Sequence, residues 1–224
     1  MAEEKFNKLH DLMATKGRLV KSTRRQVIQT SDTQRALHLV KAGYIKRYLI
    51  RNDGSLSTDL IYGPGDVFSL LLVFRALYDQ EILDSPEIYY YESLTDDVEL
   101  YSLSVEDLKK YVEENPILYK DLLNEAGKRM TYETHGLENI SMKDAYKRVG
   151  HQLAYYAKRF GEQTDGGVKI IPPLTHQDIA DLLSITRETV STCMTRLRKN
   201  GLIDISDRQI VVKDLDKLNE EAFN

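Results

Sequence analysis

Apolar and polar residues in the first hundred positions are arranged in short runs that are typical of β-strands. Residues 98–103 alternate as a half-buried strand does, and residues 36–42 read as a strand that runs into a turn at Gly43. Residues 44–50 are strand-like as well, and they lead into a hairpin turn at 51–54. Regularly spaced short strands without long helices between them predict an antiparallel β-roll of the jelly-roll kind.

The pattern changes to that of helices after about residue 104, and a long helix is expected from near Pro116 to about Ile140. One stripe of this helix is apolar at spacings of three, four or seven, with Glu133 as its polar interruption. The stripe consists of Tyr119, Leu123, Ala126, Met130, Leu137 and Ile140. Such spacing predicts a coiled-coil seam between two copies of the chain. Leu118 and Leu122 lie on a flanking face of the helix and can pack on the strand region of the same chain. The alternative to the seam is a surface helix that packs only within its own chain.

A second helix is expected to follow the long one directly. Ser141 and Asp144 resemble a capping box, so this helix would begin near residue 141 and end near Phe160. Its apolar face carries Val149, Leu153, Tyr156 and Phe160. The glycine-rich residues 161–167 then predict a loop.

The residues that follow predict two short helices and a β-hairpin. Thr175, with Asp178 three residues later, forms a capping signal for the first helix, which breaks at 184–185. Thr186 caps the second helix, and Gly201 ends it. Residues 202–212 read as a hairpin. This arrangement predicts a winged helix-turn-helix, whose second helix enters the major groove of DNA.

The length of 224 residues fits two domains better than one. The expected fold class is α+β, in three parts. These are a β-roll sensor-like domain at 1–114, a dimerisation helix at 115–140 and a winged helix-turn-helix domain at 141–224.

Charge is distributed unevenly along the chain. The net charge of −4 by itself argues against a nucleic-acid partner. However, residues 141–213 carry 12 Lys and Arg against 8 Asp and Glu, whereas residues 1–140 carry 18 against 23. An acidic body with a basic C-terminal unit suits DNA binding through one end only.

The chain is expected to be cytoplasmic and to have no membrane partner. Its longest apolar run, residues 70–74, is far shorter than the roughly 20 residues that span a bilayer. Its acidic N-terminus lacks the features of a secretory signal. Its one cysteine, Cys193, fits a reducing compartment. Cys193 lies on the inward face of its helix, which favours a place in the core over redox sensing.

The segment 174–212 resembles the C-terminal domain of the Crp/Fnr family of bacterial transcription regulators. The resemblance rests on Arg187-Glu-Thr-Val-Ser191, on Asn200-Gly-Leu-Ile203 and on the strand 210–212. Residues 39–45 and 63–68 resemble, more loosely, the family's strand-into-glycine motif and its turn into the effector pocket. The resemblance implies a roll, a dimer helix and a winged helix in that order. It also implies double-stranded DNA, a second copy of the chain and RNA polymerase as partners.

Carried over by position, the resemblance places Arg187 and Glu188 against base edges, with Ser191 and Thr192 on the same face. The positions that match phosphate contacts are Gln177, Thr186 and Thr189. Arg196, Arg198 and Lys199 are interpreted as general attraction to phosphate and as favourable charge at a helix end. Thr192 departs from the arginine that many members have, and Ser184 replaces the usual turn glycine. A solvated Arg–Glu pair is the alternative for Arg187 and Glu188.

The effector of the roll domain is left unknown, and the usual ones are not expected. Cyclic-nucleotide binders of the family use a glycine-glutamate turn and a downstream arginine, whereas this chain has Val67-Phe-Ser-Leu-Leu71. Residues 76–108 contain ten Asp and Glu and no Lys or Arg, so a cyclic phosphate should be repelled. Residues 77–92 look like an insertion in the pocket region. Its tyrosines are expected to pack within a strand, and the alternatives are that they line a site for an organic ligand or fill the pocket. A single cysteine argues against an iron–sulfur cluster, and five scattered histidines argue against a metal or haem.

The leading hypothesis is a homodimeric regulator that reads a palindromic DNA site and is not an enzyme. One alternative is a DNA-binding protein that needs no effector. The other is a cupin-like metalloenzyme, which the absence of a His-x-His pair disfavours.

Overall fold

A computed structural model describes residues 7–30, 35–54, 56–78, 89–206 and 209–223. The chain packs as two units, one drawn from residues 1–50 and 60–132 and the other from 51–59 and 133–224. The three-part division expected from the sequence stays a prediction. In the part of the chain that is described, no helix is long and apolar enough to cross a membrane.

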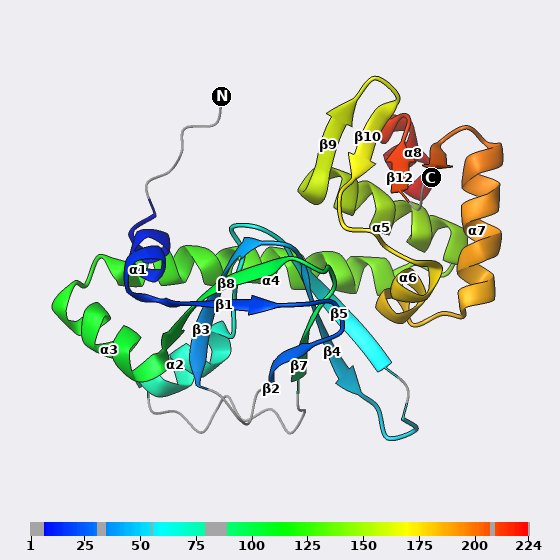
Figure 1. Cartoon of the computed structure of the whole chain (residues 1–224). Helices are drawn as coiled ribbons and strands as arrows, with labels where there is room; N and C mark the ends of the chain where they lie inside the picture. The colour runs from blue at the N-terminus through cyan, green and yellow to red at the C-terminus, as the bar shows by residue number, and fades with distance from the viewer. Residues whose placement is uncertain (1–6, 31–34, 55, 79–88, 207–208, 224) are drawn as a thin grey trace. The chain divides into compact units, whose positions relative to one another are not determined.

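The first unit is built mainly from strands (Figure 1). Its elements are α1 (Lys8–Lys16), β1 (Arg18–Ser22), β2 (Val27–Thr30), β3 (Ala36–Ala42), β4 (Ile45–Ile50), β5 (Leu56–Tyr62), β6 (Val67–Phe68), α2 (Leu70–Tyr78), β7 (Tyr89–Ser93), β8 (Val98–Ser104), α3 (Val105–Glu114) and α4 (Leu118–Ser141). The residues of α4 from Glu133 onward and those of β5 up to Asp59 belong to the second unit.

The second unit continues with shorter elements. They are α5 (Ala145–Phe160), β9 (Gly161–Thr164), β10 (Gly167–Ile170), α6 (His176–Leu183), α7 (Arg187–Lys199), β11 (Ile203–Ser206), β12 (Gln209–Val212) and α8 (Leu215–Phe223).

Two four-stranded sheets form the roll, and their pairings are antiparallel. Their strand orders are β1-β8-β3-β6 and β2-β7-β4-β5. Side chains from both sheets meet in one cluster that includes Val40, Tyr62, Phe68 and Tyr91, so the sheets pack face to face. The short strands and the turns at 51–54 and 63–66 occur where the sequence predicts them.

The strand β3 is buried on both faces. Val40 points into the cluster between the sheets, whereas Leu37 and Leu39 pack against helices on the other side. Successive side chains of a strand point to opposite faces, so a sheet covered on both sides needs a continuous buried run instead of an alternation. Residues 37–40, all buried, are that run.

The helices α1, α2, α3 and the first turns of α4 cover this sheet through one apolar cluster. Leu118 and Leu122 are buried in it, as the sequence predicts, and they share it with Leu9 and Met13 of α1. The carboxylate of Asp121 accepts a hydrogen bond from the Leu9 amide at 3.1 Å, which fastens the start of α1 to α4. The helix α1 is not predicted from the sequence.

The second unit contains a four-stranded sheet with the order β11-β12-β10-β9. The expectation of a loop over residues 161–167 is wrong, because these residues form β9 and the turn into β10. Gly167 has a φ of +124°, a conformation that a side chain rarely permits. The glycines therefore serve a tight hairpin that extends the wing sheet.

The junction of α4 and α5 also differs from the sequence prediction. Ser141 is the last residue of α4, and its hydroxyl donates to the Glu138 carbonyl at 2.6 Å. The N-cap of α5 is Asp144, whose carboxylate accepts from the Tyr146 amide at 2.8 Å. The capping box expected at Ser141 is thus wrong, and the two helices are separated by only three residues, 142–144.

Replacing Asp144 by alanine should lower the free energy of unfolding by about 1 kcal/mol, because the first amides of α5 lose their acceptor. Urea unfolding followed by circular dichroism measures the change. Ser141→Ala is the matched control and should cost less than about 0.5 kcal/mol. A larger loss at Ser141 than at Asp144 would restore the capping box at the earlier residue.

Candidate nucleic-acid interface

The helix pair α6–α7 has the local chemistry of a helix-turn-helix. The hydroxyl of Thr175 accepts from the Asp178 amide at 3.1 Å, and the Asp178 carboxylate accepts from the Thr175 amide at 2.8 Å. Ser184 ends α6 in the left-handed conformation, with a φ of 50°. Thr186 then caps α7 by accepting from the Thr189 amide at 3.1 Å. The predicted capping, turn and second helix are confirmed.

One face of α7 is buried and the opposite face is exposed. The inward side chains are Val190, Cys193, Met194 and Leu197, and they meet the buried residues Ile179, Ala180 and Leu183 of α6. The exposed face carries the four proposed base readers, Arg187, Glu188, Ser191 and Thr192. Ser191 and Thr192 also line a shallow hollow of about 400 Å³ together with Thr195, Arg196 and Lys199. The four base readers lie together at the exposed start and middle of the helix.

These side chains suit the edges of base pairs. A guanidinium can donate two hydrogen bonds to guanine, and a carboxylate can accept from cytosine. The hydroxyl of Thr192 donates to the Glu188 carbonyl at 3.0 Å, so it remains an acceptor. Thr192 therefore offers the DNA a hydrogen-bond acceptor and a methyl group in place of a positive charge.

The proposed phosphate contacts are distributed around the same end of the unit. Gln177 is exposed, and its amide donates to the Asp181 carboxylate at 2.7 Å. Thr186 and Thr189 are joined by a hydroxyl–hydroxyl hydrogen bond of 2.9 Å at the start of α7. Because the first amides of a helix attract anions, this end of α7 also suits a phosphate.

The basic end of α7 is more ordered than the sequence indicates. The guanidinium of Arg196 lies 4.0 Å from the ring centre of Tyr146 on α5. The Tyr146 hydroxyl donates to Glu221 at 2.8 Å and accepts from the Asn200 amide at 2.9 Å. Arg198 pairs with Asp204 of the wing at 3.4 Å. The positions of Arg196 and Arg198 are therefore set by partners that the sequence did not reveal.

The wing follows α7 as the sequence predicts. Gly201 has a φ of +71°, and β11 then pairs with β12 from Ile203 opposite Val212 to Ser206 opposite Gln209. The β12 strand also pairs with β10, so the wing is the edge of a larger sheet. The tip, residues 207–208, lies outside the described residues.

Several aromatic rings cluster between the two sheets of the roll. Phe68 stacks on Tyr91 with ring centroids 4.8 Å apart and on His38 at 4.7 Å, and Tyr62 packs beside it at 5.4 Å. Burial, and then the charge of Arg18, lower the pKa of His38 to about 4, so its ring is neutral. Most of the insertion expected at 77–92 lies outside the described residues. The parts that are described are residues 77–78, which end α2, and residues 89–92, which lie in β7.

The acidic residues 76–108 are not all uncompensated, as the sequence argument assumed. Glu99 pairs with Lys21 and with Lys41, each at 2.7 Å, and Glu92 pairs with Lys46 at 3.0 Å. These lysines come from other strands. The repulsion expected for a cyclic phosphate is therefore weaker than the local sequence indicates.

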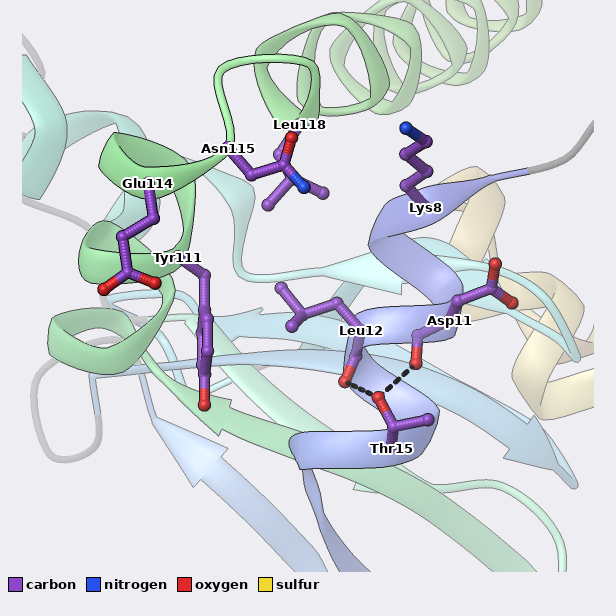
Figure 2. Close-up of a pocket in the computed structure, with 8 residues that line it drawn as sticks. All are labelled: Lys8, Asp11, Leu12, Thr15, Tyr111, Glu114, Asn115 and Leu118. Carbon is purple, nitrogen blue, oxygen red and sulfur yellow. Dashed lines mark hydrogen bonds between the residues drawn. The ribbon is translucent and has the colours of Figure 1, made fainter.

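A cavity of about 540 Å³ opens between α1, α3 and the start of α4. Figure 2 shows Lys8, Asp11 and Thr15 of α1 on one side and Tyr111 and Glu114 of α3 on the other. Its walls mix charged and apolar groups. The sequence did not single out these residues.

The expectation that the histidines are scattered is wrong for two of them. The rings of His135 and His151 stack with centroids 4.2 Å apart, and the carboxylate of Glu138 lies beside them. The signal was present in part, since His135 and Glu138 are three residues apart on one helix.

Comparisons with known proteins agree with this geometry. Residues 147–221 match the family model of the Crp-like helix-turn-helix domain. The chain is 25% identical over 186 residues to a CRP-like cAMP-activated global transcriptional regulator of Mycobacterium tuberculosis, covering 83% of this chain and 79% of that protein. It is 35% identical over 112 residues to a probable transcriptional activator of Rhizobium leguminosarum bv. viciae, which is 50% of this chain and 47% of that protein.

Solved structures show the same fold. A mutant of CooA from Carboxydothermus hydrogenoformans superposes with a TM-score of 0.74 at 22% identity, covering 97% of this chain and 96% of that one. FixK2 from Bradyrhizobium japonicum superposes with a TM-score of 0.73 at 20% identity, covering 91% and 96%. The predicted fold class is confirmed.

Cys193 should react slowly with a chromogenic disulfide reagent in the native protein. Its side chain is 7% exposed, and burial followed by the charge of Asp144 raises the pKa of the thiol, so little thiolate is present at neutral pH. The rate should rise steeply on unfolding in urea. Equal rates in the native and unfolded protein would show that Cys193 is an accessible thiol and not a core residue.

Proposed function

We propose that this chain, which belongs to the Crp/Fnr family of transcription regulators, binds a palindromic DNA site as a homodimer without control by cyclic AMP. The observation that carries the proposal is that one chain has both an exposed polar face on α7, suited to reading DNA, and an exposed apolar stripe on α4. Because α7 offers one reading face per chain, two chains are needed to read two half-sites.

The dimer is supported by the exposure of the stripe. Leu123, Met130, Leu137 and Ile140 of α4 are each about two-thirds or more exposed in the single chain, and Tyr119 is 40% exposed. Ala126, between Leu123 and Met130, is half-buried. Covering a large apolar side chain contributes about 1.5–3 kcal/mol, so a seam of this length favours association. Residues at these heptad spacings are those that a second copy of α4 would cover.

The reading of DNA follows from the residues of α7. In the proposal Arg187 and Glu188 contact base edges, and Ser191 and Thr192 contact the next pairs along the groove. Two α7 helices in a dimer would enter successive major grooves about 34 Å apart, which selects a palindrome.

Phosphate contacts from the same surface fix the register. The proposal assigns them to Gln177, Thr186, Thr189, Arg196 and Lys199. The stacking of Arg196 on Tyr146 holds one of these charges in place before DNA arrives, which lowers the entropy lost on binding. RNA polymerase, which the family resemblance implies as a partner, is part of the proposal.

The exclusion of cyclic AMP is supported by residues of the roll. The segment Val67–Leu71 lacks the glycine and glutamate of the cyclic-nucleotide binders, and the rings of Tyr62, Phe68 and Tyr91 occupy the space between the sheets. This cluster of rings is compatible with the alternative in which DNA binding needs no effector. Thermal unfolding in the presence of cyclic AMP tests whether this nucleotide binds, because a bound ligand raises the melting temperature. We expect no change.

Replacing Leu123 or Met130 by glutamate should convert the dimer to a monomer, because the seam would bury a charge in each chain. Sedimentation velocity at micromolar concentration measures the change. The matched control is Asn124→Glu, which adds the same charge at an exposed position of α4 off the stripe. A wild-type monomer, or variants that remain dimeric, would contradict the homodimer.

Replacing Arg187 by alanine should cost about 1–3 kcal/mol per half-site on the preferred DNA and relax the preference at one base pair. The preferred site is first selected from a random pool, and binding is then measured by fluorescence anisotropy. Lys199→Ala is the contrasting variant. It should weaken all sequences equally and lower the salt slope by about 0.9 per chain. If Arg187→Ala binds the selected site as the wild type does, Arg187 reads no base.

A further inference from the structure

Three side chains with metal-binding atoms meet where the end of α4 crosses α5. They are His135 and Glu138 of α4 and His151 of α5, and one ligand atom of each lies within 4.8 Å of the other two. All three belong to the second unit. The cluster takes no part in the proposed DNA contacts or in the proposed dimer seam.

The rings are held in place from several sides. His135 lies between His151, with ring centroids 4.2 Å apart, and Tyr155, at 3.7 Å. The Asn139 amide lies 3.3 Å from Nδ1 of His151 and also donates to the Arg148 carbonyl at 2.9 Å. The two imidazoles are therefore positioned by neighbours on both helices.

One nitrogen of this cluster is unsatisfied. Nε2 of His135 is buried and has no hydrogen-bond partner among the described residues. Buried polar atoms are nearly always paired, so an exception calls for a ligand. An imidazole nitrogen without a hydrogen-bond partner can serve as a metal ligand.

We propose that His135, Glu138 and His151 bind a divalent transition-metal ion of the Zn²⁺ type, with water as the fourth ligand. Two imidazoles and a carboxylate suit Zn²⁺ and its neighbours, whereas Mg²⁺ and Ca²⁺ prefer oxygen ligands only. Tetrahedral ligands at about 2.1 Å from zinc lie about 3.4 Å apart. The three ligand atoms lie within 4.8 Å of one another, and metal binding would bring them closer together.

An ion at this site would fasten the last turns of α4 to α5. Only residues 142–144 separate the two helices, and α5 packs against α7, the proposed reading helix. The metal would therefore stiffen the support of α7. Metal binding itself does not depend on the proposed DNA function, and its test requires no DNA.

The test is a Co²⁺ and Zn²⁺ titration of the full chain, prepared without a polyhistidine tag. Co²⁺ should give visible absorption bands of tetrahedral intensity at one equivalent per chain, and Zn²⁺ should bleach them. Competition with a chromophoric chelator gives the Zn²⁺ affinity. Glu138→Gln and His151→Gln should each weaken it about tenfold or more.

Two controls make the result decisive. Glu220→Gln removes an exposed carboxylate from the same unit and should leave the affinity unchanged. Glu138 is exposed, so Glu138→Gln keeps the fold and decides the matter if His151→Gln does not fold. At the same Zn²⁺ concentration the melting temperature should rise more for the wild type than for Glu138→Gln. Absence of Co²⁺ bands in the wild type, or equal affinity in Glu138→Gln, overturns the proposal.

Discussion

Three faces of the helix α4 have different surroundings, and the spacing of residues along the helix decides which residues lie on each face. One face buries Leu118 and Leu122 among the helices that cover the roll. Another face is apolar and exposed, from Leu123 to Ile140. A third face, near the end of the helix, places Asn139, which is almost fully buried, against α5. Because faces of a helix are fixed by spacing, a change of one residue in its length would rotate the later contacts away from the earlier ones.

Features that depend on local chemistry were predictable from the sequence. The capping residues Thr175 and Thr186, the left-handed turn at Ser184 and the glycine at 201 each act on a few neighbouring residues, and all lie where expected. The prediction at Ser141 is wrong because both serine and aspartate are good N-cap residues. Either Ser141 or Asp144 could therefore begin the next helix. The helix continued through the serine, and the cap formed on Asp144.

Features that depend on long-range packing were not predictable. The helix α1 is held by Asp121, which lies more than a hundred residues away in the sequence. The stacking of His135 on His151, the lysine partners of Glu92 and Glu99, and the contact of Arg196 with Tyr146 all join separate elements. No spacing along the chain reports such meetings, because the crossing of two helices or the pairing of two strands decides them.

The chain of contacts from Arg196 to Tyr146 and on to Glu221 ends in α8, near the C-terminus. The last helix therefore supports a charge on the side of α7 that is proposed to face DNA, although none of the proposed reading residues lies on it. Tail sequences that differ between otherwise similar regulators would then tune the strength of DNA binding without altering the sequence that is read. Changes in α8 would then alter the affinity for DNA, while the sequence specificity stays with α7.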